Sequence, residues 1–208
     1  MAHILKGVAM SIIAKVRDSF LPLLGDVGLG ILTLMYVMEQ NGRVDASVFW
    51  LLPLMFLPDL EALPKLLRRG KAASSLAHPK YNHEEVLPPI LWLAPTGLWW
   101  HYGGFYGEVA CMLLFVHFLH KSVLIGWGVS WFRPFWEDRL KFFADYTNKN
   151  SLSISDWIRV FPRFKLRGLI DRYGDEEWVA HNYHRVTVVS VIEYGLFLWS
   201  LVVLYKWL

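Results

Sequence analysis

The chain has 208 residues, of which 55% are hydrophobic and 19% are charged, and its formal net charge is +3. This length allows one domain, or one membrane bundle with an inserted soluble segment. The charge is too small and too scattered to indicate nucleic acid as a partner. The single cysteine, Cys111, excludes an internal disulfide framework and a zinc–thiolate site.

Hydrophobic residues are concentrated in a few long runs. In chain order these runs occupy residues 19–38, 47–57, 86–100, 106–125 and 186–208. A run of about 20 apolar residues is long enough to cross a bilayer as a helix. Many of the eleven tryptophans lie near the ends of the runs, as in the aromatic belts of membrane proteins. We therefore expect an all-α fold, a polytopic helical membrane bundle of about four to five spans.

The N-terminal part of the chain predicts three helical elements. Residues 4–16 carry apolar side chains at helical spacing, which indicates an amphipathic or partly inserted helix. The first full span, 20–38, contains Asp26, which fits either a functional role or a helix-breaking, interfacial one. A short span at 47–57 follows and ends before Pro58.

The next loop, at 58–86, sets the expected orientation. Its basic residues are Lys65, Arg68, Arg69, Lys71 and Lys80. By the positive-inside rule this loop is cytoplasmic, and 126–185 then returns to the same side. We expect a multi-pass protein of the inner (plasma) membrane. Its parts are a membrane helical domain at 1–132, a cytoplasmic helical segment at 133–185 and a C-terminal transmembrane helix at 186–208.

This topology gathers most histidines on one side of the membrane. Seven of the eight fall at cytoplasmic ends of their segments, with His101 as the exception. The seven are His3, His78, His83, His117, His120, His181 and His184. Asp59 and Glu61 fall on the same side. Since chance would scatter these residues, their clustering indicates a site at the membrane surface.

Imidazoles and carboxylates together suit zinc, manganese or iron. Each residue also has a simpler interpretation: Asp59 as a helix cap, His78 as a loop residue and His83 as a solvated surface group. The combination of these residues, rather than any single one, predicts a divalent metal site. A metal bound there would lower the pKa of a water ligand towards 7, as a hydrolytic reaction requires.

The order of these motifs resembles the YdjM-like inner-membrane proteins, a family of membrane-bound metal-dependent hydrolases distantly similar to zinc-dependent phospholipase C. His3 matches an N-terminal histidine, LPDLE at 57–61 a carboxylate motif, and HPKYNH at 78–83 a paired-histidine motif. HFLHK at 117–121, followed by GWGVSWFRPF, matches a helix that leads into an aromatic turn. The resemblance covers about residues 1–135.

The resemblance implies a metal site, with zinc as the expected ion and manganese or iron as alternatives. The implied metal ligands are His3, Asp59, His83 and His117, with Glu61 and His78 as further ligands or their neighbours. If the chain is a hydrolase, we expect His120 and Lys121 to be its catalytic groups, Lys121 as a cation that stabilises an anionic transition state.

Three departures from the family pattern bear on this site. Glu61 stands where the family has aspartate, and the arginine and threonine of the paired-histidine motif are missing between His78 and His83. Lys121 stands where the family has the aspartate four residues after the helical histidine. Positions i and i+4 share one face of a helix, so the Lys121 ammonium would repel a dication near His117. Three outcomes follow: His120 replaces the missing ligand, the site holds one metal fewer, or the site is inactive.

Three functions are therefore compatible with the sequence. The first is a membrane-bound hydrolase acting on a phosphoester or similar small or lipid-like substrate at the cytoplasmic face. The second is an inactive membrane scaffold or regulator of the same fold. The third is a small transporter that uses Asp26 and Glu193. Membrane lipids are the expected partners, and 133–185 could bind anionic headgroups or a protein.

Overall fold

The structure is a computed structural model, and it describes residues 21, 23–60, 87–123, 128–143, 157–173 and 178–207. These residues are mostly helical. In chain order the elements are α2 (Leu23–Gln40), the 3-10 helix η1 (Ala46–Phe56), α3 (Leu57–Leu60), α5 (Pro89–Gly103), α6 (Phe105–Val123), β1 (Arg139–Phe142), β2 (Ile158–Phe161), α7 (Arg163–Tyr173), α8 (Trp178–Tyr183) and α9 (Val188–Trp207). The expected helical class is confirmed for this part of the chain.

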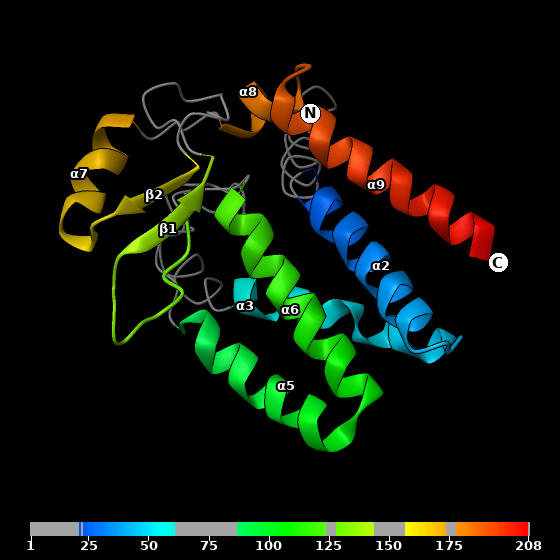
Figure 1. Cartoon of the computed structure of the whole chain (residues 1–208). Helices are drawn as coiled ribbons and strands as arrows, with labels where there is room; N and C mark the ends of the chain where they lie inside the picture. The colour runs from blue at the N-terminus through cyan, green and yellow to red at the C-terminus, as the bar shows by residue number, and fades with distance from the viewer. Residues whose placement is uncertain are drawn as a thin grey trace, which may run out of the picture.

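The long helices lie side by side around α2. Helix α9 packs along one side of α2 and α6 packs along another, while α5 covers the outer side of α6 (Figure 1). Helices α2 and α9 run in the same direction, and α6 runs opposite to α2 (Figure 1). The start of α2, the start of α9 and the end of α6 therefore meet at one end of the bundle.

Two glycines of α2 allow α9 to approach closely. A Cβ at Gly28 would lie 2.8 Å from backbone atoms of Leu196 and Phe197. A Cβ at Gly25 would overlap with the carboxylate of Glu193. Small residues at a helix contact let two backbones come together, as is common in membrane helix pairs. Here they also leave room for a carboxylate between the two helices.

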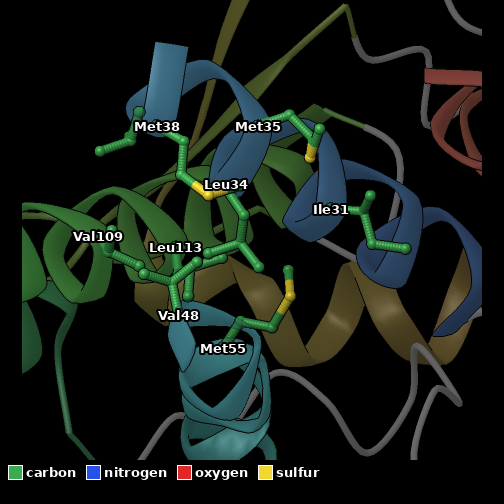
Figure 2. Close-up of a cluster of buried hydrophobic side chains, with 9 residues drawn as sticks. Ile31, Leu34, Met35, Met38, Val48, Met55, Val109 and Leu113 are labelled. Atoms are coloured by element: carbon green, nitrogen blue, oxygen red, sulfur yellow. The ribbon is translucent and has the colours of Figure 1, made fainter. Parts of the chain in front are cut away.

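The apolar core lies between α2, η1 and α6. Leu34 and Met38 of α2 meet Val48 and Met55 of η1 and Leu113 of α6, and all five side chains are buried (Figure 2). The core fixes α2 against α6, and α6 continues from it towards the polar end of the bundle, where its last turns carry His117, His120 and Lys121.

A small antiparallel sheet is the main departure from the expected architecture. Strands β1 and β2 pair with Leu140 opposite Val160, and the backbone of Leu140 also bonds that of Val129. The expectation that 133–185 is helical is wrong for these strands. Each strand has only four residues, the shortest length at which alternation of polar and apolar residues indicates a strand, and β2 (IRVF) does not alternate throughout. The sheet contacts α6 and lies near its C-terminal end (Figure 1).

Two of the described helices, α2 and α9, are long and apolar enough to cross a membrane. Helix α6 has 19 residues but includes Glu108, two histidines and a lysine. Helix α5 has 15 residues and η1 has 11. Length and composition thus support two spans directly, fewer than the four to five expected from the sequence.

Candidate metal centre

Six polar side chains gather at one end of the bundle. They come from the start of α2, the end of α6, the start of α9 and the short helix α3. The group consists of Asp26, Asp59, His117, His120, Lys121 and Glu193. Four of these residues are at most 4% exposed: Asp26, His117, His120 and Glu193. A buried polar cluster of this kind is costly to form unless its members interact with one another or with a ligand.

Helix α6 presents its three polar residues in its last turns. His117 and Lys121 share one face because they are four positions apart. His120 points instead into the space between α2 and α9, where it meets carboxylates from both helices. The sequence predicts that Lys121 and His117 share one face of the helix, and this arrangement agrees with that prediction.

His120 joins two carboxylates that are far apart in the sequence. Its Nδ1 lies 2.7 Å from Oδ1 of Asp26, and its Nε2 lies 2.9 Å from Oε1 of Glu193. Both ring nitrogens are therefore engaged, and neither has a lone pair to offer a metal. The expectation that His120 replaces a missing metal ligand stays a prediction, and in this arrangement both ring nitrogens contact carboxylates instead.

His117 lies between the carboxylate of Asp26, which also contacts His120, and the carboxylate of Asp59, at distances longer than ordinary hydrogen bonds. Its Nδ1 is 3.5 Å from Oδ1 of Asp26, and its Nε2 is 3.8 Å from Oδ1 of Asp59. The ring is fully buried, and within the described part of the chain neither nitrogen has a hydrogen-bond partner. Leaving a buried polar group without a partner costs about 1–3 kcal/mol. Among the described residues, none supplies a hydrogen bond to the His117 ring, which is thus placed to take a further partner.

Asp26, Asp59 and His117 together form a possible metal site. One ligand atom from each residue lies within 4.8 Å of the others. Two carboxylates and one imidazole are a donor set that divalent metals accept. A cation between them would give the buried His117 ring a partner and would balance the carboxylate charge. The residues present therefore fit a divalent metal.

Lys121 is the sixth member of the cluster and forms an ion pair with Oδ1 of Asp59. The two side chains keep 15% and 14% of their surface exposed, so this pair marks the more open side of an otherwise closed cluster. The ammonium thus binds one of the three possible metal ligands. Any cation at this site has to share Asp59 with Lys121 or displace it.

The structure brings together Asp59, His117, His120 and Lys121 of the predicted site residues. His3, Glu61, His78 and His83 lie outside the described residues. Asp26 and Glu193 were not among the predicted metal ligands, although both carboxylates enter the cluster. Their one sequence signal is a lone acidic side chain inside an otherwise apolar helix, which by default indicates a function.

Comparisons with known protein families, curated proteins and solved structures find no match to this chain. The resemblance to the YdjM-like proteins therefore depends on its motifs alone. Of those motifs, the carboxylate at 59 and the histidine at 117 lie within the described residues, and they are neighbours in the fold.

Proposed function

We propose that this chain is a membrane-bound metal-dependent hydrolase that acts on a phosphoester or similar substrate at the cytoplasmic membrane face. One observation carries the proposal: His117 is fully buried, lacks a hydrogen-bond partner in the described chain, and lies between Asp26 and Asp59 at distances suited to sharing a cation. Zinc is the proposed ion, with manganese and iron as alternatives.

Four residues of the cluster have a direct role in this proposal. Asp26, Asp59 and His117 hold the cation, and their burial keeps bulk water away from most of its surface. A bound divalent metal supplies an activated water and polarises a phosphoryl oxygen. Lys121, beside Asp59, offers a second positive charge that orients an anionic phosphoester and stabilises charge that develops on its oxygens.

Further features of the helices support membrane placement, beside the two helices that are long and apolar enough to cross a membrane. Helix α6 is about 28 Å long at 1.5 Å per residue, close to the thickness of a bilayer core. At the end of the bundle away from the polar cluster, Trp50, Tyr102 and Tyr205 are each more than 80% exposed. Exposed aromatic side chains of this kind suit a membrane–water interface. We infer a multi-pass bundle with the polar cluster at its opposite, cytoplasmic end.

This placement also favours a class of substrate. The more open pair, Lys121 and Asp59, lies at the level of the bundle where the helices end, which is the level of lipid headgroups in the proposed orientation. A phosphoester at this depth belongs to a lipid or to a small molecule that reaches the membrane surface. We therefore propose a lipid-like or small phosphoester as substrate.

Hydrolysis by the reconstituted protein tests the proposal. The wild-type chain in proteoliposomes would be assayed with a chromogenic phosphodiester and with a phospholipid, each with zinc, manganese or iron. We expect turnover that a chelator abolishes and that His117→Ala lowers at least about a hundredfold, as for loss of a group needed in the transition state. His101→Ala, at an exposed residue outside the cluster, is the matched control. Absence of turnover with every metal would overturn the proposal.

The ion pair between Lys121 and Asp59 favours a second candidate, an inactive membrane scaffold of the same fold. In that case the lysine takes the place of a cation and holds α3 against α6. The scaffold would bind no metal and would catalyse no hydrolysis, and the Lys121→Ala variant would lose stability without any change in metal content.

A further inference from the structure

The C-terminal helix contributes a carboxylate to the polar cluster. Glu193 lies in the second turn of α9, and its side chain is fully buried. The motifs shared with the YdjM-like proteins end near residue 135, so they give this helix no role. Within the structure, Glu193 reaches the candidate metal site through a single intermediate, the ring of His120.

The connection is a continuous line of three side chains from three helices. Oε1 of Glu193 lies 2.9 Å from Nε2 of His120, and Nδ1 of the same ring lies 2.7 Å from Oδ1 of Asp26. All three residues are at most 4% exposed. The imidazole is therefore fixed at both nitrogens, and it in turn fixes one oxygen of Asp26.

The contact between α2 and α9 leaves space for the Glu193 side chain. Gly25 has no Cβ, and the carboxylate of Glu193 fills the space that a Cβ would take. One turn further, Gly28 brings the α2 backbone against the backbone of α9. The carboxylate of Glu193 also interacts with the hydroxyl of Tyr183. Packing alone does not account for a buried acidic side chain here, because an apolar residue would fill the same space without the cost of burying a carboxylate.

We propose that Glu193 and His120 are positioning residues that orient Asp26 as a metal ligand. This proposal rests on the proposed function. Metal ligands are commonly held by hydrogen bonds from a second layer of side chains, whose loss lowers metal affinity about 10–100-fold. Glu193 fixes the ring plane of His120, and His120 holds Asp26 so that the carboxylate faces His117. The C-terminal helix then completes the site as well as anchoring the chain.

The test measures zinc affinity by competition with a chelator, using the full chain in detergent. Two variants remove different parts of the interaction: Glu193→Gln keeps an oxygen that accepts a hydrogen bond, whereas Glu193→Leu removes it. Ser200→Ala is the matched control, because Ser200 is also buried on α9 and, among the described residues, its hydroxyl bonds the Phe197 carbonyl of its own helix. Absorption of the cobalt-loaded protein reports the ligand geometry independently of activity.

We expect zinc affinity to decrease from wild type to Glu193→Gln and further to Glu193→Leu. Between wild type and Glu193→Leu the affinity should fall about 10–100-fold. The cobalt spectrum should change in both variants, and Ser200→Ala should match the wild type in both measurements. If Glu193→Leu does not fold, the zinc affinity and cobalt spectrum of Glu193→Gln, compared with those of wild type, test the proposal.

Two results would overturn the proposal, and they are distinguishable. Wild-type affinity and an unchanged cobalt spectrum in Glu193→Gln and Glu193→Leu would mean that α9 only packs against the site. An equal loss in Ser200→Ala would mean the same, because any disturbance of α9 would then suffice. A wild-type protein that binds neither zinc nor cobalt would instead remove the proposed function itself, and this proposal with it.

Discussion

Lys121 and Asp59 form an ion pair across 62 positions of sequence. The pair joins the last turn of α6 to the short helix α3 and lies next to the buried ring of His117. A lysine here neutralises a carboxylate that a metal would otherwise use. The strength of metal binding therefore depends on the competition between the Lys121 ammonium and the cation for Asp59.

Lys121→Asp is expected to strengthen metal binding. The substitution removes a positive charge that opposes a dication and adds a carboxylate four positions after His117, on the same helix face. We expect metal affinity to rise about tenfold or more, which corresponds to at least about 1.4 kcal/mol. Chelator competition on the purified variant measures this change. Unchanged or weaker affinity would show that Lys121 does not compete for the site.

Gly28→Ala is expected to destabilise the bundle. The added methyl group would lie 2.8 Å from backbone atoms of α9, which cannot move without shifting the helix. Overpacking of this kind costs about 1–3 kcal/mol. Gly195→Ala is the control, because a Cβ there has no atom within 4 Å, and alanine is the better helix former. Thermal unfolding in detergent should show a lower midpoint for Gly28→Ala alone, and equal midpoints would refute the close contact.

Asp45 is expected to make stability depend on acid pH. It lies in the turn before η1, where hydrogen bonds from Ser47 and Tyr106 lower the pKa of its carboxyl to about 2. Because the folded pKa is below the unfolded one, the stabilisation is complete above about pH 4 and disappears as the pH falls through 2. The difference in unfolding midpoint between wild type and Asp45→Asn should therefore shrink between pH 5 and pH 2. A constant difference would contradict this assignment.

The two ends of the bundle are expected to face opposite sides of the membrane. Val44, in the turn after α2, is 79% exposed, and Phe164, in α7 beside the sheet, is 81% exposed. In a Cys111→Ala background, Val44→Cys should react with a membrane-impermeant maleimide in intact spheroplasts. Phe164→Cys should react only after the membrane is opened. Labelling of both positions from the same side would contradict the proposed orientation.

The apolar runs predict the long helices because composition alone identifies a helix that can be buried in lipid or protein. The run at 106–125 corresponds to α6, and the last run contains α9. The strands β1 and β2 could not be predicted in the same way. Each has four residues, and their pairing depends on contacts between segments that are separated in the sequence.

The candidate site shows the same limit. The motif resemblance predicted Asp59 and His117, because each lies in a recognisable local pattern. Asp26 and Glu193 have no such pattern around them, and their roles depend on His120, which lies 94 and 73 positions away from them. The sequence shows that both are acidic residues in apolar helices, where burying a carboxylate costs free energy. Only the packing of α2, α6 and α9 shows that both contact His120.

The metal content of the purified protein tests the central claim most directly. Elemental mass spectrometry would compare wild type, His117→Ala and the control His101→Ala, each purified in detergent and loaded with zinc, manganese or iron. The account predicts about one equivalent of metal in wild type and His101→Ala, and its loss in His117→Ala, because His117 is the imidazole donor among the three described ligands. Absence of metal from the wild type after loading, or equal metal in His117→Ala, would contradict it.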